Sequence, residues 1–146
     1  MSSFKKRHVI ACTAASIGAL SIAFAPQASA AVGVDCTNSS RCLALSYNSN
    51  IQGSMTGFKD TAVSNFAGYT FLSSGSGQGQ SVKNNAASAQ FADWVSPNDW
   101  ASIFYNSGYA GACDSIPANT LVNRLANTYN QNASFNWTHP SSCYDF

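Results

Sequence analysis

Short runs in which apolar and polar residues alternate recur along the chain, and each run is bounded by Gly, Asn, Ser or Pro. Alternation with a period of two is typical of β-strands that bury one face. Four runs carry the pattern, at residues 43–47, 69–72, 101–105 and 133–137. Helical periodicity is scarce, and only residues 120–126 are expected to form a helical turn. The pattern predicts an all-β, sandwich-like fold.

A weak internal repeat divides this pattern into two halves. The string YNSNIQG at residues 47–53 returns 58 residues later as YNSGYAG at residues 105–111. The string NNAAS at residues 84–88 is echoed 46 residues on by NQNAS at residues 130–134. Because both strings occur in the same order in each half, we expect two homologous units of four strands each.

The two expected units span roughly residues 42–92 and 101–137 and together form one domain at residues 31–146. Residues 73–80, with the sequence SSGSGQGQ, lie inside the first unit. A segment this short and this rich in Gly and Ser is typical of a flexible loop rather than of a linker between domains.

The chain begins with the features of a removable signal peptide that ends at Ala30. Basic residues 5–8 precede an apolar stretch from Val9 to Ala25, and Ala28-Ser29-Ala30 supplies the small-residue cleavage pattern. The stretch is shorter than the roughly 20 apolar residues that a membrane-spanning helix needs. Cys12 lies too early in it to mark a lipoprotein cleavage site. We therefore expect a secreted, extracellular protein with no membrane attachment in its mature form.

Removal of the signal peptide changes the charge of the chain. The mature part keeps four Lys and Arg residues against six Asp residues and no Glu, which gives a formal net charge of −2. Such a balance offers no electrostatic footprint for nucleic acid or anionic lipid. We expect a monomer that binds no nucleic acid.

Four cysteines remain after cleavage, and an even count in an exported chain indicates two disulfides. Three pairings are open, of which we expect Cys36–Cys42 as a local staple and Cys113–Cys143 as a clasp on the C-terminal tail. A zinc site is the alternative. It lacks a Cys-x-x-Cys pair, and His139 is the one imidazole of the mature chain.

Enzymatic catalysis finds little support among these residues. A Ser or Cys nucleophile usually needs a histidine base, and His139 lies in the tail next to Pro140. The chain has no HExxH string, no phosphate-binding glycine loop and no glutamate to act as a general acid. We expect no catalytic residues and no required cofactor.

A doubled Asp-Trp pair, Asp93-Trp94 and Asp99-Trp100, surrounds Pro97. Tryptophan can stack on a sugar ring while aspartate accepts its hydroxyl protons, and two carboxylates can serve a glycosidase. More often such tryptophans fill the core between two sheets and such aspartates cap turns. We expect core packing and turn capping.

The second copy of the repeat resembles the βγ-crystallin fold. Each unit of that fold opens with an aromatic residue, four residues, a second aromatic residue, one residue and a glycine. Phe104, Tyr109 and Gly111 match this spacing, whereas the first half keeps only Gly53. The glycine is needed where the turn requires a positive φ, and the aromatic residue covers the turn. The resemblance implies a Greek-key sandwich of two four-stranded units, here stapled by disulfides.

Among proteins with this fold, the chain is similar to the secreted bacterial peptidase-inhibitor family whose founding members block metalloproteinases. The resemblance rests on the signal peptide, the cysteine pair at Cys36 and Cys42, the Leu-x-Leu-x-Tyr strand at residues 43–47 and the NNAAS string. It implies an inhibitor of an extracellular peptidase. The alternatives are a calcium-binding structural or cell-surface module and a small antimicrobial or toxin-like protein on the same fold.

Crystallin-like domains of microbes bind Ca²⁺ through an Asn/Asp-rich string that ends in a Ser or Thr hydroxyl. By this resemblance the ligands would be Asn84, Asn85 and Ser88 in one site, and Asn130, Gln131 and Ser134 in a poorer one. Ala89 departs from the pattern at its last position. Because most of the oxygens are neutral, the resemblance implies weak affinity, on the order of 10⁻⁴–10⁻³ M. The alternative is that these residues only hydrogen-bond a hairpin.

An inhibitor needs a rigid loop that enters the enzyme cleft already in its bound shape. The segment that follows the second glycine turn and contains a half-cystine is the candidate, with an ordinary structural bridge as the alternative. It consists of Ala112, Cys113, Asp114, Ser115, Ile116 and Pro117. In the founding inhibitors the reactive loop is closed by a short-range disulfide, which Cys113 lacks, so the reactive bond cannot be carried over.

Overall fold

A computed structural model describes Cys36 and residues 41–146. The predicted signal peptide at residues 1–30, together with Cys12, lies outside the described residues. The described part of the chain contains eight β-strands and no helix, which confirms the predicted all-β class. None of its segments is therefore a helix long and apolar enough to cross a membrane.

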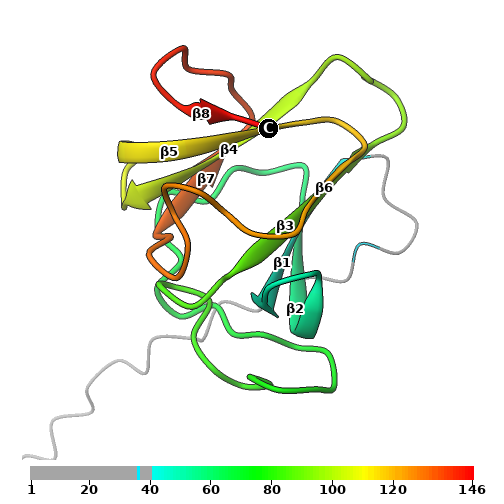
Figure 1. Ribbon diagram of the computed structural model, residues 1–146, viewed down its shortest axis with the longest axis vertical. Coiled ribbons are helices and arrows are strands. Elements are labelled where there is room, and N and C mark those ends of the chain that lie inside the picture. The colour runs from blue at the N-terminus through cyan, green and yellow to red at the C-terminus, as the bar shows by residue number, and fades with distance from the viewer. Residues whose placement is uncertain (1–35, 37–40) are drawn as a thin grey trace, which may run out of the picture.

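The strands form two four-stranded sheets that pack against each other (Figure 1). The first sheet has the order β2 (Gln52–Lys59), β1 (Arg41–Asn48), β3 (Ser88–Asp93), β6 (Thr120–Val122). The second has the order β7 (Ser134–Asn136), β4 (Trp100–Asn106), β5 (Ala110–Pro117), β8 (Tyr144–Asp145). All neighbours are antiparallel except β5 and β8, which are parallel.

The two halves of the chain are joined by backbone pairing, and the first sheet contains a strand from the second half. From the second half, β6 pairs with β3, with Val122 opposite Ala89. In return, Val63 of the first half forms an antiparallel bridge with Phe135 of β7. This pairing joins the two repeats into one Greek-key sandwich, because β6 completes the first sheet and Val63 bridges to the edge of the second.

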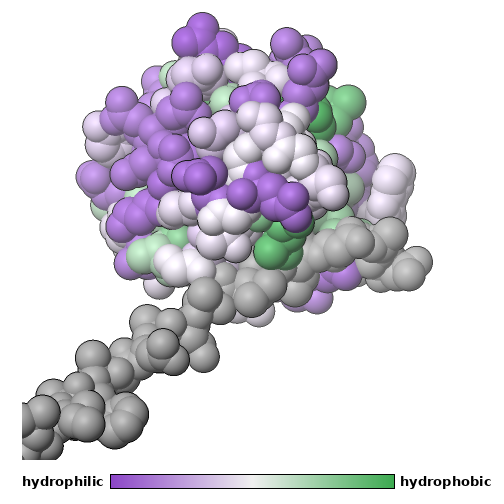
Figure 2. Space-filling model, turned by 90° about the horizontal axis from the view of Figure 1, so that it is seen from below, coloured by the Kyte–Doolittle hydropathy of each residue, from purple (hydrophilic) through white to green (hydrophobic). Residues whose placement is uncertain are grey.

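The core lies between the sheets and is filled by inward-facing residues from both. Leu43 and Leu45 alternate along β1 and are fully buried, as the period of two predicts. Phenylalanine rings pack at the centre, with the Phe135 ring centroid 5.3 Å from that of Phe58 and 6.0 Å from that of Phe66. Each fully buried side chain of this size contributes roughly 1.5–3 kcal/mol. Outside the core, hydrophilic residues dominate the face shown in Figure 2.

Both predicted disulfides are present. Cys36 pairs with Cys42 at a Cα–Cα distance of 5.7 Å, which ties the chain before β1 to the first sheet. Cys113 pairs with Cys143 at 4.6 Å, which holds β8 beside β5 (Figure 1). Disulfides persist in oxidising compartments, so both bonds indicate an oxidising environment.

Two local predictions were wrong. The expected helical turn at residues 120–126 begins as strand β6, because pairing with β3 satisfies its backbone in the sheet. The expected strand at residues 69–72 contributes one isolated bridge, between Thr70 and Ser81. The segment Ser73–Gln80 lies outside the strands, as predicted.

The segment Ala112–Pro117, predicted to be an inhibitory loop, is instead part of β5, between β4 and β8. Its residues 113–116 are buried. The carboxylate of Asp114 accepts hydrogen bonds from Asn127 N at 2.9 Å, Thr128 N at 2.9 Å and Thr128 Oγ1 at 2.6 Å. These partners allow a polar segment, loop-like in sequence, to lie inside a sheet. A buried central strand cannot enter an enzyme cleft.

Candidate functional site

The hairpin between β1 and β2 is tied back to β3 by one serine. Ser88 Oγ donates a hydrogen bond to Asn48 O at 2.6 Å and accepts one from Ile51 N at 3.1 Å. The turn passes through positive φ at Ile51 (56°) and Gly53 (77°). A branched residue such as isoleucine rarely adopts this conformation, so the serine bridge compensates for local strain.

The hairpin between β4 and β5 repeats this arrangement. Ser134 Oγ donates to Asn106 O at 2.7 Å and accepts from Tyr109 N at 3.1 Å. Positive φ values recur at Tyr109 (62°) and Gly111 (84°). The internal repeat seen in the sequence is therefore a structural repeat in which each serine performs the same task.

The residues proposed as calcium ligands fit that ion poorly. Ser88 and Ser134 are fully buried, and both hydroxyls are engaged by the hairpins. The side-chain nitrogen of Asn85 donates to Ser81 O and Lys83 O. No group of three or more His, Cys, Asp or Glu side chains that could hold a metal occurs within the described residues. Because Ca²⁺ takes 6–8 oxygen ligands and favours carboxylates, its binding here stays a prediction.

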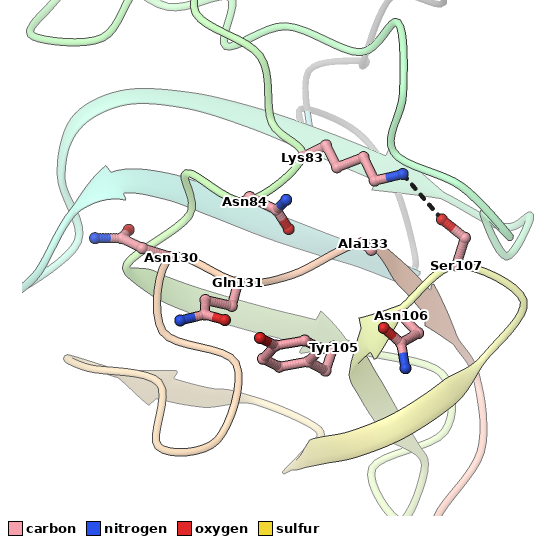
Figure 3. Close-up of a pocket in the computed structure, with 8 residues that line it drawn as sticks. All are labelled: Lys83, Asn84, Tyr105, Asn106, Ser107, Asn130, Gln131 and Ala133. Atoms are coloured by element: carbon pink, nitrogen blue, oxygen red, sulfur yellow. Dashed lines mark hydrogen bonds between the residues drawn. The ribbon is translucent and has the colours of Figure 1, made fainter.

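Three of the proposed ligands, Asn84, Asn130 and Gln131, do come together, at an open cleft of about 390 Å³ beside the second hairpin (Figure 3). The rest of its lining is Lys83, Tyr105, Asn106, Ser107 and Ala133. Sequence reasoning did not connect Lys83 or Tyr105 with the asparagine strings. The signal available was the repeated Tyr-Asn-Ser triplet, whose second copy supplies one wall of the cleft.

The charge of this cleft comes from one ammonium group. Lys83 Nζ donates to Asn65 Oδ1 and to Ser107 Oγ, both at 3.1 Å, and Figure 3 shows the second of these bonds. No carboxylate is among the lining residues. A cleft with a positive group and no negative one repels a metal cation.

A second candidate is the connection between β3 and β4, residues Asp93–Asp99. Trp94 is 76% exposed and Val95 is 73% exposed, so the expectation that Trp94 fills the core was wrong. Asp93 is buried and caps the turn, with its Oδ1 accepting from Val95 N at 3.0 Å and from Ser96 N at 2.8 Å. Turn capping by this aspartate was predicted correctly.

Both ends of this loop are fastened to the turn that joins β5 and β6. Asp93 N donates to Asn119 Oδ1 at 3.2 Å, and Asn119 Nδ2 donates to Asp93 O at 3.0 Å. At the other end, Ala118 N donates to Asp99 O at 2.9 Å. Arg41 lies between the two aspartates. Its Nε is 3.9 Å from Asp93 Oδ2, and its Nη1 is 3.6 Å from Asp99 Oδ2. The loop is therefore held at both ends.

Trp100 and His139 form a separate cluster near the C-terminus. The two rings stack with centroids 3.8 Å apart and an angle of 3° between their planes. His139 Nε2 lies 2.9 Å from Asp145 Oδ1. These contacts connect the tail to β4, and they give His139 a structural role.

Comparison with known proteins gives the fold and no closer relationship. No protein-family model matches the chain, and no curated protein matches it. A structure described as "Evolution of the eye lens beta-gamma-crystallin domain fold" matches with a TM-score of 0.51 and 20% identity, covering 70% of this chain and 90% of that one. The N-terminal domain of Protein S matches with a TM-score of 0.46 and 22% identity, covering 64% and 91%. With two Greek-key units that are joined by the pairing of β6 with β3, the chain has the βγ-crystallin fold.

Proposed function

We propose that the protein is a secreted peptidase inhibitor whose contact element is the loop Asp93–Asp99. The observation that carries this proposal is the exposure of Trp94 and Val95 on a loop that is fastened at both ends. Exposed neighbouring apolar side chains of this size make no contribution to the core, and they are typical of surfaces that dock a partner.

The internal hydrogen bonds of the loop favour inhibition over mere contact. A segment that is already ordered loses little entropy when it binds a partner. Asp93 orders the backbone of Val95 and Ser96 directly. Pro97 fixes its own φ and restricts the backbone of Ser96 before it. Trp94 is the natural anchor, because tryptophan is enriched among the residues that dominate binding energy.

The experiment is a titration of the purified, disulfide-intact protein against a thermolysin-like metallopeptidase and a subtilisin-like serine peptidase. We expect stoichiometric inhibition of one of them. Trp94→Ala should weaken that inhibition at least 30-fold, since truncation of an anchor costs about 2 kcal/mol or more. Leu72→Ala, which trims an exposed apolar side chain outside the loop, is the control and should change it less than twofold.

Two results would overturn the proposal. The first is the absence of inhibition of either enzyme when both disulfides are shown to be intact. The second is equal inhibition by the Trp94→Ala variant and the unchanged protein, which would place the contact elsewhere.

A further inference from the structure

We propose that the cleft beside the second hairpin binds a neutral saccharide. Its wall consists of the side chains of Asn84, Asn130 and Gln131 on one side and of Tyr105 and Ser107 on the other (Figure 3). The site is distinct in its residues from the loop Asp93–Asp99, so the two proposals stand or fall separately.

The amide groups match the chemistry of sugar hydroxyls. Each hydroxyl of a sugar donates one hydrogen bond and accepts others, and each Asn or Gln side chain offers both donors and an acceptor. Asn84 and Asn130 are placed at the cleft by positive φ values of 64° and 53°. The backbone segments that carry the two asparagines are hydrogen-bonded to each other. Asn84 N donates to Asn132 O at 2.8 Å, and Asn130 N donates to Ala86 O at 2.9 Å. The amides therefore project from a rigid frame.

Tyr105 adds a surface for the apolar face of a sugar ring. Its side chain is 43% exposed, and its hydroxyl lies on the side of Gln131 (Figure 3). The equivalent residue of the first half, Tyr47, instead makes an edge contact with Phe71 at 5.6 Å and packs against the core. An exposed aromatic ring next to polar groups is a common arrangement where one end of a ligand is apolar and the other polar.

The charges of the cleft favour an uncharged ligand over ions. The ammonium group of Lys83, without a carboxylate in the lining, opposes a metal cation. Recognition of phosphate normally uses arginine forks or several backbone amides. Here the one cationic group already donates to Asn65 and Ser107. A polyhydroxylated neutral molecule matches the amide groups and the aromatic ring of the cleft without needing a charged partner.

The test is a titration of the isotopically labelled, disulfide-intact protein followed by its amide resonances. The probes are chitotriose, cellotriose and maltotriose, with inorganic phosphate and calcium chloride as rival ligands. We expect at least one saccharide to shift resonances of Tyr105, Ser107, Asn130 and Gln131, with a dissociation constant on the order of 1 mM, as suits a shallow open site. Shifts caused only by phosphate or calcium would overturn the proposal, as would the absence of shifts with all three saccharides.

A pair of tyrosine variants locates the binding. Tyr105→Ala should raise the dissociation constant at least tenfold, because the ring supplies the apolar contact. Tyr144→Ala removes another exposed tyrosine, which lies outside the cleft, and should change it less than twofold. Unaltered binding in the Tyr105→Ala variant, with its amide spectrum otherwise native, would contradict the proposed site.

Discussion

The two hairpins of this fold are the same structure with different surroundings. In the first, the loop Ser73–Gln80 packs directly on Tyr47: a Cβ atom added at Gly77 would lie 2.1 Å from the ring. Ser54 N donates to Ser76 O at 2.8 Å and fixes the loop in place. In the second half no such loop is inserted, and Tyr105 stays exposed beside a cleft.

The difference shows that two copies of one hairpin can place the same residue in different surroundings. The hairpin itself is shared, since Ser88 and Ser134 tie it in matching ways. What varies is the insertion between strands, which loops tolerate more readily than sheets do. The tyrosine of the first copy, Tyr47, packs against the core, and that of the second copy, Tyr105, is exposed to solvent.

The largest expected effect concerns the glycine that lets the loop approach Tyr47. Gly77→Ala should destabilise the protein by about 3 kcal/mol, through positive φ (87°) and collision with the ring. Gly108→Ala is the matched control in the second hairpin, where φ is also positive (76°) but the space is open, and should cost only about 1 kcal/mol. Urea unfolding of the disulfide-intact proteins measures both. Equal losses would mean that the loop does not press on Tyr47.

A smaller effect tests what the two hairpins share. Ser88→Ala and Ser134→Ala should each cost about 2 kcal/mol, because each leaves a backbone carbonyl and amide without the buried hydroxyl. The two losses should agree within about 0.5 kcal/mol, since the distances are nearly the same in both halves. Thermal or urea unfolding provides the comparison. A clear inequality would show that the loop over Tyr47 also supports the first hairpin.

Much of the fold could be predicted from local patterns, because a strand with one buried face repeats every two residues. Residues 43–47 and 101–105 lie in β1 and β4 for this reason. The even number of cysteines after residue 30 indicated two disulfides, and the two pairings that we expected among the three possible ones are present. The pairing of β6 with β3 was not predicted, since periodicity identifies a strand and not its partner.

The candidate sites were harder to predict because exposure depends on tertiary partners. Residues 112–117 contain Asp and Ser and look like a loop, yet Asn127 and Thr128 satisfy Asp114 inside the sheet. Trp94 looks like a core residue, yet it lies on a capped turn beyond the end of β3. Asp114 is satisfied by residues that are distant in the sequence, and Trp94 lies on the turn that Asp93 caps. Neither composition nor alternation predicts such contacts.

The smallest expected effect concerns Lys83, whose ammonium group is the charged group in the lining of the open cleft. The equivalent position in the second half is Tyr129, which packs against the core and lies under Arg124 at 4.3 Å. Lys83→Met keeps the aliphatic stem and removes two hydrogen bonds to neutral partners at the surface. Because water can replace such bonds, the loss of stability in urea should be about 0.5 kcal/mol or less. A loss several times larger would show that Lys83 stabilises the contact between Asn65 and Ser107.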